Sequence, residues 1–148
     1  MTKPRSQRLQ VVLAVAERKR QEAERFLADA QRRVNQGENG IVQLQGYLGE
    51  YQQQFTATGR EGISIQDLHV QQAFMQKITH TMQEQEQALQ QARDQVQQVQ
   101  AYWQQTYARQ KGIENLVQKA QNEESHERDR KLQQEIDERS QHVRPRYI

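Results

Sequence analysis

Apolar residues recur every seven positions through the first half of the chain, in two sets that are three residues apart. The first set, at the a positions of a heptad repeat, comprises Leu13, Arg20, Leu27, Val34, Ile41, Leu48 and Phe55. The second set, at the d positions, comprises Leu9, Ala16, Ala23, Ala30, Gly37, Leu44 and Tyr51. Only Arg20 and Gly37 clearly depart from an apolar core. A seven-residue repeat of this length predicts a helix in a left-handed coiled coil.

The second half of the chain repeats the pattern. Its a positions are Leu68, Met75, Met82, Leu89, Val96, Trp103, Gln110 and Val117. Its d positions are Gln71, Ile78, Gln85, Ala92, Val99, Thr106, Ile113 and Ala120. Residues 56–62 between the halves lack periodicity and contain two glycines, which indicates a tight turn. Because a short link makes long helices antiparallel neighbours, the sequence predicts an all-α fold, a long two-helix antiparallel coiled-coil hairpin.

We expect one hairpin domain over residues 1–148. The predicted elements are a first helix over about 6–56, a turn over about 57–64, a second helix over about 65–120 and a charged overhang over 121–148. The overhang begins where the first helix has no residues left to pair. Its Glu–Arg spacings favour a helix that ends at Arg144-Pro145. It is either a solvated, frayed tail or a segment that orders on a partner.

The register of the two helices depends on where the turn is centred. A turn centred between Gly59 and Arg60 places a large residue opposite a small one in most layers, which fills space evenly. The resulting pairs include Trp103 with Ala16, Leu89 with Ala30, and Met75 with Leu44. A slip of one heptad pairs Trp103 with Ala23 instead and is less regular. We therefore predict the first register.

The two edges of the helix pair differ. The e positions beside the seam are nearly all polar, whereas the g positions carry large apolar groups. The apolar g residues are Val12, Phe26, Tyr47, Phe74, Tyr102 and Leu116. They either widen the core by covering the seam or form a protein-binding stripe, in which Tyr and Phe are the favoured anchors.

Composition supports a thin helical molecule rather than a compact domain. Only 34% of the 148 residues are hydrophobic and 31 are glutamine, a good helix former. The absence of cysteine excludes disulfides and zinc–thiolate sites. No apolar run approaches the roughly 20 residues that span a bilayer, and residues 1–5 lack a signal-peptide core. We expect a cytoplasmic protein.

Charge is unevenly distributed although the net charge is only +2. Residues 1–33 carry nine basic and four acidic side chains, and residues 34–100 carry three and seven. A basic amino-terminal end favours an acidic partner surface, a membrane or nucleic acid. Acidic residues interleave with the basic ones, which argues against nucleic acid. The interleaved acids are Glu17, Glu22, Glu24 and Asp29.

The sequence carries no pattern of catalytic or ligand-binding chemistry. The four histidines form no paired metal motif, and Glu123 and His126 make only one of the two Glu-x-x-His motifs that a di-iron bundle needs. There is no phosphate-binding loop after a strand and no serine nucleophile elbow. Two helices also enclose no pocket that excludes water. We expect no enzyme, no catalytic residue, no metal or cofactor and no small-molecule ligand.

Several local segments, together with the length and the hairpin pattern, resemble the bacterial flagellar export protein FliJ family over nearly the whole chain. These segments are Tyr47-Leu-Gly-Glu-Tyr51-Gln-Gln, Gly59-Arg-Glu-Gly62-Ile63-Ser64, Gln72-Ala-Phe74 and Trp103-Gln-Gln-Thr-Tyr107-Ala. The resemblance implies a coiled coil similar to the central stalk of rotary ATPases. It also implies a soluble component of the flagellar type III export apparatus, peripherally associated with the inner face of the cell membrane. Such a component links the export ATPase ring to the membrane export gate and binds export chaperones.

The resemblance also implies two binding surfaces. Positions of the family's gate-binding surface fall here on Leu44, Tyr47, Tyr51, Phe74, Ile78, Thr81 and Gln85. The last two stand where Ala and His are expected. The ends of the coiled coil would enter the ATPase ring. Basic residues near the amino terminus are candidates for an electrostatic guide, or form an ordinary solvated face: Arg5, Arg8, Arg18, Lys19 and Arg20.

Two other functions fit the same pattern. One is the equivalent stalk of a virulence type III secretion system, and the other is a structural coiled coil that self-associates through the g edge. The export role predicts a monomer in solution, which separates it from the self-associating alternative.

Overall fold

The computed structural model describes residues 3–142, and these form two α-helices. Helix α1 comprises Arg5–Glu61 and α2 comprises Ile65–His142, with no strand in the described range. The predicted all-α two-helix hairpin is therefore confirmed.

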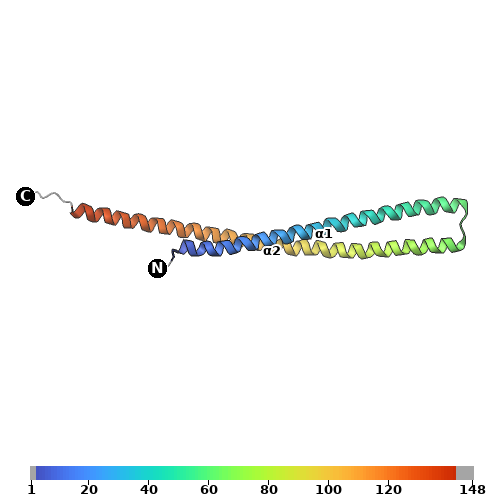
Figure 1. Ribbon diagram of the computed structural model, residues 1–148, viewed down its shortest axis with the longest axis horizontal. Coiled ribbons are helices and arrows are strands. Elements are labelled where there is room, and N and C mark those ends of the chain that lie inside the picture. The colour runs from blue at the N-terminus through green and yellow to red at the C-terminus, as the bar shows by residue number, and fades with distance from the viewer. Residues whose placement is uncertain (1–2, 143–148) are drawn as a thin grey trace, which may run out of the picture. The chain divides into compact units, whose positions relative to one another are not determined.

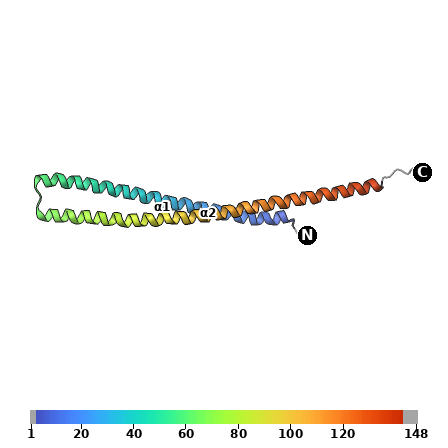
Figure 2. The same ribbon diagram turned by 180° about the vertical axis from the view of Figure 1, so that it is seen from behind.

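The chain divides into two compact units. The turn unit is Ala23–Trp103, and the terminal unit consists of the described parts of Met1–Glu22 and Gln104–Ile148. In each unit a stretch of α1 lies antiparallel beside a stretch of α2, as the opposite views in Figures 1 and 2 both show. The connection between the helices, at the green end of the chain in Figure 1, belongs to the turn unit.

Buried side chains follow the predicted heptads in both units. The buried apolar residues, all at a or d positions, are Ala23, Ala30, Ile41 and Leu89 in the turn unit, and Ala16, Ile113, Val117 and Ala120 in the terminal unit. Among the described residues no large side chain is completely buried. The core is a single seam of small contacts, so its stability depends on which residues pair in each layer.

The register differs from the predicted one by one heptad. In the turn unit Leu89 faces Gly37 rather than Ala30, because a Cβ atom at Gly37 would lie 3.2 Å from Leu89 Cδ1. In the terminal unit Ala16 packs with Ile113 and Val117 rather than with Trp103. The predicted register is therefore wrong, and the one-heptad alternative is the observed one.

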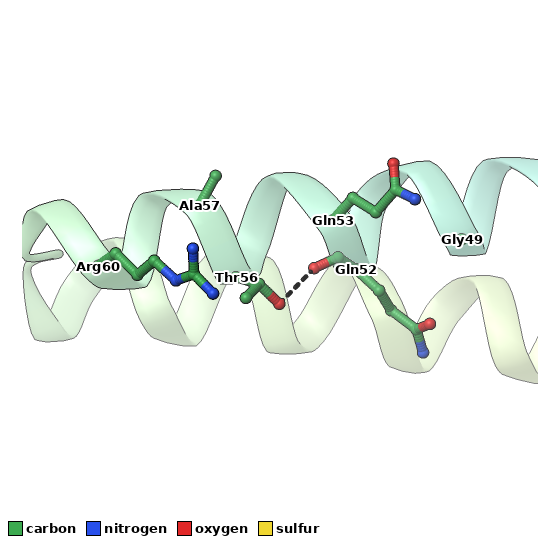
Figure 3. A pocket seen from close by; sticks show the side chains of 6 residues that line it. All are labelled: Gly49, Gln52, Gln53, Thr56, Ala57 and Arg60. Carbon is green, nitrogen blue, oxygen red and sulfur yellow. Dashed lines mark hydrogen bonds between the residues drawn. The ribbon is translucent and has the colours of Figure 1, made fainter.

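The turn explains the difference, because it is shorter and later in the chain than predicted. Helix α1 continues to Glu61, through residues 57–61 that were predicted to belong to the turn. The hydroxyl of Thr56 donates to the carbonyl of Gln52 at 3.0 Å, a helix-compatible bond seen in Figure 3. Thr58 donates in the same way to Gln54 at 2.8 Å. Threonine and glycine in this segment thus remain helical.

The chain reverses over three residues, Gly62, Ile63 and Ser64. Gly62 ends α1 with a φ of 89°, a left-handed conformation that glycine adopts without a Cβ clash. Ser64 begins α2 as an N-cap, since its Oγ accepts a hydrogen bond from the Asp67 N–H at 3.1 Å. Centring the turn on Ile63 instead of Gly59-Arg60 shifts the facing residues by one heptad.

A polar layer in the terminal unit favours the observed register. Arg20, at an a position, is half-buried, and its Nε donates to Gln110 Oε1. Gln110 is buried and donates in turn to Glu114 Oε1 at 2.9 Å. In the predicted register Arg20 would face Val99 and lose the bond to Gln110, and leaving a half-buried charge without this bond is costly.

A second polar contact ties the start of α1 to α2. Ser6 is buried, and its N–H and hydroxyl donate to the two carboxylate oxygens of Glu124 at 3.0 and 2.7 Å. Glu124 thus satisfies one of the free N–H groups of the first turn, where a helix favours negative charge. Paired residues extend to Glu124, and residues 125–142 continue α2 as a fully exposed helix. The predicted end at Arg144-Pro145 lies outside the described residues.

Cysteine pairs distinguish the two registers directly, because the natural chain has no cysteine. The double variant Leu44→Cys/Met82→Cys, which pairs in the observed register, should oxidise to an intramolecular disulfide. Leu44→Cys/Met75→Cys, which pairs in the predicted register, should remain reduced. Mobility on non-reducing gels measures both, and preferential closure of the second pair would contradict the observed register.

Removing the Glu124 carboxylate should loosen the amino-terminal end of α1. The hydroxyl and then the N–H of Ser6 lower the pKa of Glu124 below its ordinary value of 4.5. A lowered pKa in the folded chain means that this contact stabilises above about pH 4.5 and is lost as the pH falls through the folded value. The protection of the residue 6–9 amides against hydrogen exchange, relative to their intrinsic exchange rate at the same pH, should therefore fall in Glu124→Ala at pH 7 and in the natural chain on acidification. Glu123→Ala, an exposed neighbour, should leave it unchanged.

Candidate protein-binding surface

One apolar groove lies on the g edge of the turn unit. It measures about 430 Å³ and is lined by residues of both helices: Leu44, Tyr47, Glu50, Tyr51, Gln54, Phe74 and Ile78. Five of the seven positions predicted for gate binding therefore line a single groove. The d positions supply its floor and the g positions its rim, so the heptad pattern of each helix brings these side chains together.

An aromatic pair forms the centre of the groove. The ring centroids of Tyr51 and Phe74 are 4.8 Å apart and the rings are tilted by 38°. Tyr51 is half-buried, whereas Phe74 and Tyr47 are 47% and 60% exposed. Tyr51 therefore supports the rim from below, and Phe74 and Tyr47 present apolar surface that a partner would cover.

The other two predicted gate positions lie outside the groove. Thr81 is half-buried, and its hydroxyl donates to the Lys77 carbonyl at 2.9 Å. Gln85 is exposed, and its Oε1 lies 3.5 Å from the Cβ position at Gly40. Both flank the groove farther along α2 and provide no apolar surface.

Two groove residues were missed from the sequence. Glu50 brings the only ionisable carboxylate of the lining, and Gln54 brings an amide. Gln54 occupies a g position, so the heptad pattern contained the signal for its place on this edge. The lining holds no basic side chain, which leaves apolar contact and hydrogen bonding as the chemistry of the groove.

Four of the five predicted ring-binding cations of α1 lie on adjacent heptad positions of its exposed side, and the fifth faces α2. Arg5 and Lys19 occupy the g edge, Arg8 a neighbouring c position and Arg18 the f position on the back of the helix, and all four are exposed. Arg20 is half-buried at its bond to Gln110 in the terminal unit. Arg20 thus bonds α1 to α2 and also adds to the positive electrostatic potential near the start of α1.

A second depression, on α1 next to the turn, is polar and open. Figure 3 shows the side chains that line it, from Gly49 to Arg60, all on the same helix. Within residues 3–142 no three His, Asp or Glu side chains gather as metal ligands. No helix of this range has the length and apolar content to cross a membrane. The groove with Tyr51 and Phe74 is thus the leading candidate for a binding site.

Comparison with protein families gives a match to the family model described as flagellar FliJ protein, over residues 5–144. The chain belongs to the FliJ family. This confirms the resemblance drawn from the aromatic segments and the turn, and it makes the chain a flagellar export-associated protein. The FliJ family is a non-catalytic coiled-coil component of export. Neither the comparison with curated proteins nor the comparison with solved structures gave a match.

Truncating Tyr51 and Tyr47 in turn should distinguish a side chain that stabilises the fold from one that only provides exposed surface. Tyr51→Ala removes the ring packed on Phe74 and should lower the free energy of unfolding by about 2 kcal/mol, less than a fully buried aromatic because Tyr51 is half-buried. Tyr47→Ala removes an exposed ring and should change it by no more than about 0.5 kcal/mol. Urea unfolding followed by circular dichroism measures both. Equal losses would contradict the division into floor and rim.

Proposed function

We propose that this FliJ-family chain is a stalk and adaptor of the flagellar export apparatus that links the export ATPase ring to the membrane export gate. The apolar groove of the turn unit would bind the cytoplasmic domain of the gate. The terminal unit would enter the ATPase ring, and the chain would also bind export chaperones. The observation that carries the proposal is the gathering of Leu44, Tyr47, Tyr51, Phe74 and Ile78 in one groove of a family member.

The chemistry of the groove supports a protein partner over a small ligand. It is open along the edge of two helices, and its aromatic rim is exposed, as in the anchor regions of protein interfaces. A single carboxylate, Glu50, and no cation line it. A partner surface with one or two apolar side chains and few charges fits these walls.

The terminal unit supports the ring contact through charge. Arg5, Arg8, Arg18 and Lys19 are exposed on the adjacent g, c and f positions of α1, and such a cluster of positive charge steers association with an acidic surface. Chaperone binding is proposed from family membership alone.

Loss of the groove's aromatic rim should strongly weaken gate binding while leaving the fold intact. The double variant Tyr47→Ala/Phe74→Ala should weaken binding to the purified cytoplasmic domain of the gate at least about tenfold, since exposed aromatic anchors dominate such contacts. Isothermal titration calorimetry measures the affinity, and circular dichroism reports helicity. A matched control is Val42→Ala/Ile65→Ala, which removes two exposed apolar side chains of the turn unit outside the groove.

Two results would count against the proposal. Undiminished gate binding by Tyr47→Ala/Phe74→Ala would remove the groove as the site, and equal weakening by the control would show that general apolar surface is responsible. Sedimentation of the natural chain at tens of micromolar should show a monomer. A dimer that Phe74→Ala dissociates would favour self-association through the same edge.

A further inference from the structure

The terminal unit carries an apolar patch on its g edge that is bordered by positive charge. Val12 and Val15 of α1 and Leu116 of α2 are all exposed, by 44–48%. In the observed register Val12 lies level with Leu116, and Val15 lies level with Gly112. A Cβ atom at Gly112 would meet nothing within 4 Å, so the α2 side of the patch is open. These residues form a short apolar patch along two helices.

Four cations lie at the two ends of this apolar patch. Arg8 precedes Val12 by one turn on α1, and Lys19 follows Val15 by one turn. On α2, Arg109 precedes Gly112 by about one turn and Lys119 follows Leu116 by about one turn. Each helix therefore has a cation at both ends of the patch and two small or apolar residues between them. We call the seven side chains and Gly112 the bordered patch.

The four cations of the bordered patch are available to a partner. All are exposed, and within residues 3–142 their side chains form no ion pair or hydrogen bond. Other basic residues of the terminal unit do pair: Lys111 with Glu114 at 3.3 Å and Arg130 with Glu127 at 2.6 Å. The acids nearest along this edge, Glu22 and Glu123, lie one turn beyond Lys19 and Lys119, and both are exposed.

The positive charge at both ends of the apolar patch indicates which kind of ligand would be complementary to it. From Arg8 to Lys19 the patch spans 11 residues, about 17 Å, or three helical turns. Two neighbouring rows of exposed side chains, one on each helix, form a surface on which a third helix can pack. Such a helix must bring apolar side chains to the middle of the patch and carboxylates to both of its ends. Without the carboxylates, covering the patch would desolvate four unpaired cations.

We infer that the bordered patch docks an acidic amphipathic α-helix of about three turns from a partner protein. This goes beyond the proposed ring contact, in which only cations of α1 take part. The inference adds Arg109, Leu116 and Lys119 of α2 and fixes the chemistry of the partner. It excludes Arg18, which lies on the back of α1.

The test uses the full chain and a synthetic helical peptide of about three heptads with leucine at a and d and glutamate at e and g. The same peptide with lysine in place of glutamate is the charge control. Fluorescence anisotropy should show binding of the acidic peptide and not of the basic one. The affinity should fall as sodium chloride rises, because salt screens exposed charge pairs.

Matched variants locate the contact. Val12→Ser/Lys19→Glu and Leu116→Ser/Arg109→Glu should each weaken peptide binding at least about tenfold. Val11→Ser/Arg18→Glu makes the same kinds of change one residue earlier, on the back of α1, where Val11 is 65% exposed. It should alter binding less than twofold. All three variants lower the net charge equally, so diffuse attraction predicts the same loss in each.

Three outcomes would overturn the inference: no binding of the acidic peptide to the natural chain, equal binding of the basic peptide, or equal losses in the front and back variants. Circular dichroism confirms that the variants remain helical. Val12→Ser/Lys19→Glu should still bind the gate domain, since it leaves Tyr47 and Phe74 intact. Failure of this inference is therefore distinguishable from failure of the proposed gate contact.

Discussion

The stability of both units depends on the packing between α1 and α2, in which each layer pairs one residue of α1 with one residue of α2. No third element adds to the core within the described residues, and the buried positions are mostly alanine or a single aliphatic side chain. Small layers of this kind contribute little individually and fit almost equally well when shifted by a heptad. Polar contacts therefore have a large influence on the register. Arg20 with Gln110, and Ser6 with Glu124, each have one satisfactory arrangement.

The helices could be predicted from the sequence because the heptad pattern is long and uninterrupted. The register could not be predicted from apolar size alone. Matching large to small residues favoured Ala30 for Leu89, whereas the absent side chain of Gly37 accommodates Leu89 in the structure. The two glycines near residue 60 also looked equivalent in the sequence. Of the two, Gly62 adopts a positive φ, because α1 continues through Gly59 and ends at Glu61.

The candidate site was largely predictable for the same reason. A given heptad position places a side chain on a given edge of the helix pair, whatever the register along the axis. The sequence alone therefore places Tyr47 and Phe74 on the same edge. The sequence did not indicate how deeply each side chain is buried or which side chains it contacts. Tyr51 and Phe74 meet through their rings, while Thr81 turns its hydroxyl to its own helix. These choices depend on the register and on rotamers, which residue types alone do not fix.

The reversal at Gly62, Ile63 and Ser64 constrains how a hairpin of this type changes length. The layers of the turn unit, such as Gly37 with Leu89, are set by counting from this reversal. An insertion in one arm of this unit would misalign every layer of the unit beyond it. A longer or shorter relative can keep these contacts only by gaining or losing whole heptads in both arms at once.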